Sequence, residues 1–179
     1  MWDVSKAEPL QVWQHVGAVY GAVFTRDASR VLAWSGDGAV KLWDVRKAEP
    51  LQVWQHNGVV RGAVFTRDES RVLTWSGRDG SGEVKLWDVR QAEPLQVWKH
   101  DGLVYGAMFT RDESRVLAWS RDGAVKLWDV SKAKPLQVWK HDKAVVGAEF
   151  TRDESRVLSW SFDGAVKLWD VSKAEPLQV

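Results

Sequence analysis

The chain has no cysteine, no excess of charge of either sign and no long apolar run. Without cysteine there are no disulfides and no thiolate metal sites, and a reducing compartment such as the cytoplasm is expected. The 25 basic residues nearly balance the 24 acidic ones, so neither nucleic acid nor a membrane surface is an expected partner. Apolar runs of a few residues, and a start at Met1 without a charged-then-apolar leader, predict no membrane span and no secretory signal.

What the chain does have is an internal repeat. The segment WDVSKAEPLQVW begins at Trp2, and near-copies of it begin at positions 43, 87, 128 and 169. Between the copies lies one unit, anchored on four histidines at spacings of 41, 44 and 41 residues: His15, His56, His100 and His141. This period is typical of a propeller or solenoid, whose organisation is described by the number of repeated units and not by the number of domains. We expect a single array of four units, approximately 15–54, 56–98, 100–139 and 141–179, preceded by a duplicated edge-strand segment, 1–13.

Each unit contains short β-type runs separated by turn residues. In the first unit the runs are 19–25, 30–35, 40–45 and 51–54, with a polar turn at 26–29 and the hairpin pair Asp37-Gly38. Two hairpins in series predict an antiparallel four-stranded meander. All five prolines precede the Leu-Gln-Val run, at Pro9, Pro50, Pro94, Pro135 and Pro176. Because proline cannot donate to a ladder, this run is predicted to be the outer, edge strand.

The order His, then Asp-Gly, then Lys-Leu-Trp-Asp resembles the WD-repeat family of β-propellers over the whole chain, with the Trp-Asp dipeptide at 43–44, 87–88, 128–129 and 169–170. The resemblance implies an all-β fold of four four-stranded antiparallel blades. It also implies a buried network in each blade that joins a strand tryptophan, a serine, the histidine and the turn aspartate. The four sets are Trp43, Ser35, His15 and Asp37; Trp87, Ser76, His56 and Asp79; Trp128, Ser120, His100 and Asp122; and Trp169, Ser161, His141 and Asp163. The second turn is expanded at 77–82, which leaves open whether Asp79 reaches His56.

The histidines and tryptophans each have a second interpretation. Histidines can be catalytic residues or metal ligands, but one per unit at even spacing does not bring ligands together. Clustered exposed tryptophans would indicate an aromatic box for sugars or methylated amines, whereas their recurrence in the units favours packing between neighbouring sheets. Among the tryptophans, partial exposure is expected first for the edge-strand set: Trp13, Trp54, Trp98 and Trp139. We expect no enzyme activity, no cofactor and no metal.

Differences among the copies are concentrated in a few columns. Candidate partner-binding residues are Tyr20, Arg61, Tyr105 and Val146 on the innermost strand, and Gly36, Arg78, Arg121 and Phe162 before the turn aspartate. The resemblance implies that both columns face one entrance of a central channel, and tyrosine and arginine are enriched at interface anchors. Drift at unconstrained surface positions would give the same pattern, so binding and drift both remain open.

Four blades are too few for the rings of seven or eight that the resemblance implies, within the known range for propellers. No copy carries a polar cap, so two blade faces would stay uncovered. We expect a homodimer joined head to tail at both ends into an eight-bladed ring, in which segment 1–13 of one copy competes with the shorter C-terminal copy to complete the last sheet. A four-bladed monomer with re-angled blades is the alternative.

The expected function is a non-catalytic scaffold that presents the channel entrance to a protein or peptide partner. The alternative is a repeat-derived or engineered assembly with no selected ligand in this form. The near-identical copies resemble bacterial arrays of the cyanobacterial type and engineered fragments of them. An enzyme is the third class, but there is no nucleophile with an adjacent base, and the glycine-rich residues 77–82 open no helix that could cradle a phosphate.

Overall fold

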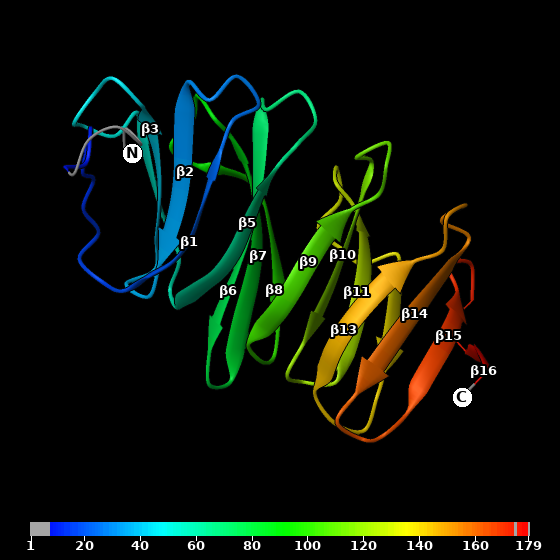
Figure 1. The fold of residues 1–179 in the computed structure, drawn as a ribbon. Coiled ribbons are helices and arrows are strands. Elements are labelled where there is room, and N and C mark those ends of the chain that lie inside the picture. The colour runs from blue at the N-terminus through cyan, green and yellow to red at the C-terminus, as the bar shows by residue number, and fades with distance from the viewer. Residues whose placement is uncertain (1–7, 174, 179) are drawn as a thin grey trace.

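The structure is a computed structural model that describes residues 8–173 and 175–178. These residues form sixteen strands in four antiparallel sheets, and each sheet keeps the strand order of the sequence. We call the sheets blades 1 to 4. Figure 1 shows them side by side in chain order, with blade 1 and blade 4 at opposite ends. The predicted all-β fold of four four-stranded antiparallel blades is confirmed.

The strands are short and lie at corresponding positions in the four blades. Blade 1 contains β1 (Val19–Phe24), β2 (Arg30–Ser35), β3 (Ala39–Asp44) and β4 (Gln52–Gln55). Blade 2 contains β5 (Val59–Phe65), β6 (Arg71–Arg78), β7 (Ser81–Asp88) and β8 (Pro94–His100). Blade 3 contains β9 (Val104–Phe109), β10 (Arg115–Ser120), β11 (Ala124–Asp129) and β12 (Gln137–Lys140). Blade 4 contains β13 (Val145–Phe150), β14 (Arg156–Ser161), β15 (Val166–Asp170) and β16 (Pro176–Gln178).

Two glycines explain why the repeated motif is so constant. Gly38, in the hairpin turn between β2 and β3, has φ of 86°, a left-handed conformation that glycine adopts without strain. Gly21, on the innermost strand, lies under the ring of Trp34 on β2, and a Cβ there would come within 2.2 Å of that ring. The same glycine and tryptophan meet in the other three blades. Packing of the β2-type tryptophan therefore requires the glycine of the V-x-G-A motif.

The apolar core lies between successive blades. Leu32, Val40, Leu42 and Trp54 of blade 1 pack against Val60, Val72 and Trp87 of blade 2, and corresponding residues form the cores between blades 2 and 3 and between blades 3 and 4. The edge-strand Trp54 is fully buried, stacks on Trp87 with ring centroids 5.6 Å apart, and donates from Nε1 to the carbonyl of Gln91 at 2.9 Å. Core packing of the tryptophans is thus confirmed. The expectation that partial exposure falls first on the edge-strand set is wrong for Trp54, Trp98 and Trp139, which are buried because each covers the next blade, whereas Trp13 is half-buried.

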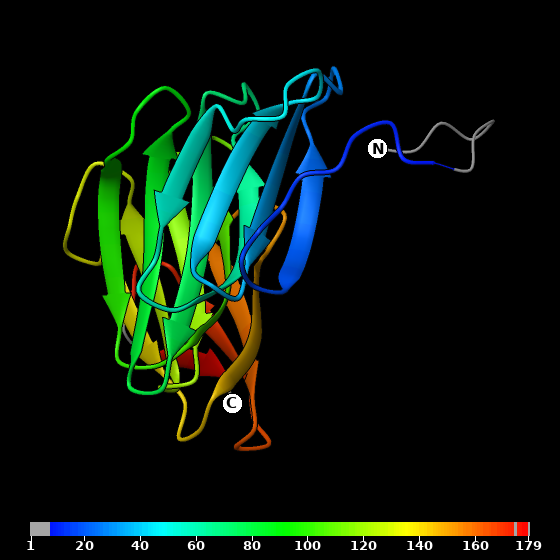
Figure 2. The same ribbon diagram turned by 90° about the vertical axis from the view of Figure 1, so that its left-hand side faces the viewer.

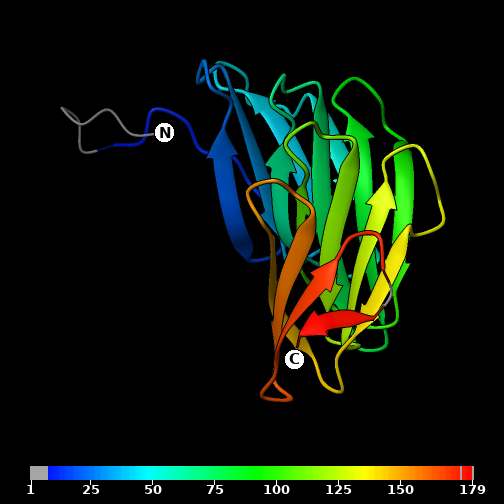
Figure 3. The same ribbon diagram turned by 90° about the vertical axis from the view of Figure 1, so that its right-hand side faces the viewer.

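The two ends of the array show the faces that internal blades bury. Val19 of β1 is 54% exposed, whereas its counterparts in blades 2 to 4 are 0% exposed. Val166 of β15 is 55% exposed, whereas its counterparts in blades 1 to 3 are 0% exposed. Figures 2 and 3 look onto these ends, and no other sheet of the described chain lies over either one. In the described residues, no helix is long and apolar enough to cross a membrane.

Candidate functional site

In blade 1, a hydrogen-bond network ties the hairpin turn to the loop before the innermost strand. Ser35 Oγ lies 2.7 Å from His15 Nδ1 and also donates to Asp37 Oδ1. Asp37 accepts the backbone N–H groups of Gly17 and Ala39, each at 2.9 Å. Burial alone would raise the pKa of Asp37, but these hydrogen bonds outweigh it and hold the pKa below its ordinary value. The aspartate is therefore a structural anion.

Blades 3 and 4 use their turn aspartates in the same way. Asp122 Oδ2 lies 3.4 Å from His100 Nδ1 and accepts the backbone N–H of Asp101 at 2.9 Å. Asp163 Oδ2 lies 3.0 Å from His141 Nδ1 and accepts the backbone N–H of Asp142 at 3.0 Å. The matching serines differ, because Ser120 Oγ donates to Asp122 whereas Ser161 Oγ donates to the carbonyl of Lys143.

Blade 2 departs from this pattern, and the assignment of Asp79 to its network is wrong in this structure. The side chain of Asp79 is 91% exposed and pairs with Arg121 of blade 3 at 2.5 Å. Its place near the histidine is taken by Glu83 of β7, whose Oε2 lies 3.8 Å from His56 Nδ1 and 3.2 Å from Lys85 Nζ. The longer turn carries Asp79 outward. The sequence signal for this exchange is the glutamate itself, which stands in a column that holds alanine in the other three copies.

The link between tryptophan and histidine also differs from the predicted one. In blade 2, Thr74 Oγ1 lies 2.7 Å from His56 Nε2 and accepts a hydrogen bond from Trp87 Nε1 at 2.8 Å. In blade 4, Ser159 makes the same two contacts, each at 2.8 Å. The predicted serines, Ser35, Ser76, Ser120 and Ser161, contact the histidine, the aspartate or a backbone carbonyl. Sequence reasoning missed Thr74 and Ser159 because their column holds alanine in the other two copies.

Burial keeps the four histidines neutral. Desolvation lowers the pKa of His15, His100 and His141, and it lowers the pKa of His56 to about 3 with a further contribution from the charge of Lys85. Each imidazole meets the β3-type tryptophan of its blade edge-on, at centroid distances of 5.5 to 6.1 Å. Among the described residues, no group of three or more histidine, aspartate or glutamate side chains is placed to hold a metal ion. These contacts are those of a packed structural element.

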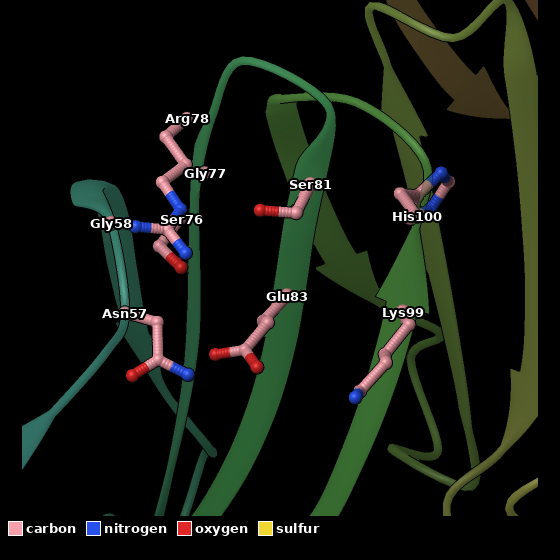
Figure 4. Close-up of a pocket in the computed structure, with 10 residues that line it drawn as sticks. Asn57, Gly58, Ser76, Gly77, Arg78, Ser81, Glu83, Lys99 and His100 are labelled. Atoms are coloured by element: carbon pink, nitrogen blue, oxygen red, sulfur yellow. The ribbon is translucent and has the colours of Figure 1, made fainter.

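The expanded turn opens a polar cavity of about 210 Å³ within blade 2, lined by residues of β6, β7 and β8 and of the loop before β5. Figure 4 shows Glu83 projecting from β7 between Asn57 and Lys99, with Arg78 and His100 at other sides of the space. Buried Glu83 Oε2 and both ring nitrogens of His100 have no geometrically sound hydrogen-bond partner in the described chain. The cavity is the consequence of replacing a compact Asp-Gly turn by a longer hairpin.

Three of the candidate partner-binding residues, Tyr20, Gly36 and Arg61, form one cluster at the junction of blades 1 and 2. The Arg61 guanidinium lies over the Tyr20 ring, 5.5 Å from its centroid, and Gly36 lies directly beside that ring. Arg121 is held by Asp79 across blades 2 and 3, and Phe162 of blade 4 is 67% exposed. The side chains of Tyr105, Val146 and Arg78 are also exposed, the last of them lining the cavity.

Four repeated four-stranded meanders, with their cores between neighbouring sheets, define the blades of a β-propeller. The family model described as WD domain, G-beta repeat, matches residues 92–129 and 133–170. The chain therefore contains WD repeats, as its motifs predicted, and blades 1 and 2 have the same four-stranded build as blades 3 and 4.

Two computationally designed proteins of known structure have a similar fold. The crystal structure of the Ika8 protein has a TM-score of 0.73 and 24% identity over 93% of this chain and 51% of that chain, so the chain spans about half of its length. The Ika4 protein has a TM-score of 0.69 and 25% identity over 88% of this chain and 93% of that chain. No curated protein matches the sequence.

Proposed function

We propose that the chain is a non-catalytic scaffold that binds a protein or peptide partner at the entrance of a propeller channel. WD-repeat propellers in general mediate protein interactions, and the family is generally not enzymatic. The observation that carries the proposal is a set of exposed side chains, Tyr20, Arg61, Arg121 and Phe162, in columns that vary while the packing columns stay constant. Tyrosine and arginine are the residue types that dominate binding energy at interfaces.

Two of these side chains are also partly ordered in advance. Stacking on Tyr20 restrains Arg61, and pairing with Asp79 restrains Arg121. Long side chains that are already held in place lose less rotamer freedom when a partner binds. This favours binding over drift as the reason for the variable columns.

We further propose that two copies close an eight-bladed ring. The two end faces are apolar and belong to the same recurring interface: Val19 and Phe24 on blade 1, and Trp160 and Val166 on blade 4, are all exposed. Three internal junctions already bury this pair of faces against each other. A face of this kind is a site of association, and a head-to-tail pair closed at both ends leaves neither face uncovered.

Trp13 supports the proposed role of the N-terminal segment. Its ring lies 5.9 Å from that of Trp43, and its Nε1 donates to the carbonyl of Lys47 at 2.9 Å. Trp54, Trp98 and Trp139 make the same contacts with the blades that follow them. Trp13 thus occupies the position of the edge strand of a preceding blade. In the ring, residues 10–13 would complete blade 4 of the other copy, in competition with its own β16 (Pro176–Gln178).

The alternative is an assembly without a selected ligand, and a peptide-display selection distinguishes the two. The assembled protein is used as bait, and enriched peptides are measured against a variant with alanine at Tyr20, Arg61, Tyr105, Arg121 and Phe162. The matched control carries alanine at five exposed outer-edge residues: Leu51, Val53, Leu95, Leu136 and Val138. Loss of binding in the entrance variant alone supports the scaffold, whereas no enrichment, or equal binding by both variants, supports the alternative. The cysteine-free composition suits the cytoplasm as the site of action.

A further inference from the structure

A carboxylate joins each pair of successive blades at the rim opposite the hairpin turns that carry the aspartates. In blades 2, 3 and 4, the T-R-D-E-S-R turn after the innermost strand places Glu69, Glu113 and Glu154 at φ of 57°, 59° and 56°. Each glutamate Oε1 accepts the backbone N–H of an arginine in the preceding blade. The pairs are Arg26 with Glu69 at 2.7 Å, Arg67 with Glu113 at 2.6 Å, and Arg111 with Glu154 at 2.7 Å.

The first of these junctions has a second contact. Glu69 Oε2 also lies 3.8 Å from Arg30 Nη2 of blade 1. A carboxylate here therefore faces a backbone donor and a cationic side chain of the neighbouring blade together. Hydrogen bonds to a charged acceptor are stronger than neutral ones.

Blade 1 has the same turn without the carboxylate. Ala28 occupies the position of the three glutamates, and its φ of 54° matches theirs. The backbone of the turn is thus unchanged, and only the acceptor is missing. Nothing within one chain needs that acceptor, because no blade precedes blade 1 in the described residues.

The difference matters once two copies meet, and this step rests on the proposed ring. There, blade 4 of one copy precedes blade 1 of the other, so that the backbone N–H of Arg152 and the side chain of Arg156 face Ala28. The apolar faces and the Trp13 contact repeat those of the internal junctions, but the carboxylate bridge has no counterpart. We infer that Ala28 makes the junction between copies the weakest in the ring, so that the ring opens between chains and each chain keeps its four blades together.

The substitution Ala28→Glu tests this inference, because it supplies the missing acceptor in a turn that already carries glutamate three times. The matched control is Ala28→Lys, which adds a side chain of similar length at the same positive φ but cannot accept a hydrogen bond. The dissociation constant of the dimer is measured for the full chain and both variants by analytical ultracentrifugation over a dilution series. Two junctions per ring each gain a bond, so Ala28→Glu is expected to tighten the dimer by about 5- to 150-fold, and Ala28→Lys is not.

A third variant, Glu113→Ala, separates assembly from folding. It removes a bridge inside the chain, so it should lower the unfolding midpoint while leaving the dimer dissociation constant within about twofold. A dimer of the parent chain that Ala28→Glu fails to tighten overturns the inference but leaves the proposed ring intact. A parent chain and an Ala28→Glu variant that both stay monomeric at all concentrations overturn the ring and the inference together. Dimerisation of Ala28→Glu alone supports both.

Discussion

The hydroxyl of Thr74 lies 2.7 Å from Nε2 of His56, and it also accepts the indole N–H of Trp87. One side chain on β6 thereby satisfies polar groups from a loop and from the neighbouring strand. Ser159 does the same in blade 4. Blades 1 and 3 have Ala33 and Ala118 at this position, and Nε2 of His15 and of His100 has no hydrogen-bond partner in the described chain. The four blades, which look alike in sequence, therefore differ in how completely their buried polar groups are paired.

We predict that Ala118→Ser stabilises the chain. The new hydroxyl would pair with His100 Nε2 in a site whose geometry blade 4 already shows, and a buried hydrogen bond contributes roughly 0.5 to 1.5 kcal/mol to the free energy of unfolding. Urea denaturation followed by tryptophan fluorescence measures the change. Thr74→Val is the matched reverse experiment, since it keeps the side-chain shape and leaves His56 and Trp87 without their partner. It should lower stability by about 1 to 3 kcal/mol; a destabilising Ala118→Ser would contradict the prediction.

Stability should decrease as the pH falls from 7 towards 4. His56 has a pKa of about 3 in the folded chain against an ordinary value of 6.5, so between these values the unfolded state binds more protons. The free energy of unfolding then falls with decreasing pH, by up to about 1.4 kcal/mol per pH unit from a single such group. Urea midpoints at pH 7, 6 and 5 check this. His56→Gln should show a shallower pH dependence, and equal midpoints for the parent chain at the three pH values would disprove the claim.

A shorter turn in blade 2 should stabilise that blade. Replacing residues 77–83 by Arg-Asp-Gly-Ala, the sequence at 121–124 of blade 3, removes Glu83 and restores an aspartate at the turn. The aspartate would bind the loop before β5 as Asp122 binds the loop before β9, and the cavity would close. We expect the free energy of unfolding to rise by about 1 kcal/mol. The same replacement with Arg-Asn-Gly-Ala keeps the turn length and lacks the charge, so it should gain less. An unchanged or lower stability with the aspartate would contradict this account.

Charges placed on the end faces should separate the two copies without unfolding either. Val19→Asp and Val166→Asp change residues that are exposed in a single chain, and in the ring each would bury an unpaired carboxylate. Light scattering after size exclusion should give a dimer for the parent chain and a 20.3 kDa folded monomer for each variant. Val125→Asp, at a fully buried counterpart of Val166, should instead unfold the chain. A monomeric parent chain would rule out the ring.

Deletion of residues 1–13 examines the N-terminal segment separately. Without Trp13, the junction loses the contact with Trp43 and the hydrogen bond to the carbonyl of Lys47. We expect the dimer to weaken at least tenfold, in line with the loss of a buried aromatic side chain. Replacing residues 1–9 by an unrelated polar sequence is the control, since it keeps residues 10–13. An undiminished dimer after the deletion would show that β16 alone completes blade 4.

The repeat made much of the fold predictable. Four copies of one motif fixed the number of blades, and turn residues such as Asp37 and Gly38 placed the strands of blade 1 within one residue of their observed bounds. Contacts across the network were less predictable. Both Ser76 and Thr74 offer a hydroxyl on β6. The register of β6 against β7 decides which of them faces the indole N–H, and a residue pattern does not specify that register. Glu83 escaped prediction because an inserted turn shifts which side chain enters the site.

Each edge-strand tryptophan covers the blade that follows it in the chain, as Trp54 covers Trp87. Because both blades contribute to each junction, a blade that melts uncovers an apolar face on each of its neighbours. Nearest-neighbour coupling of this kind lets loss of structure spread along the array from blade to blade. An open array has a first and a last blade for such a process to start from. A closed ring has neither.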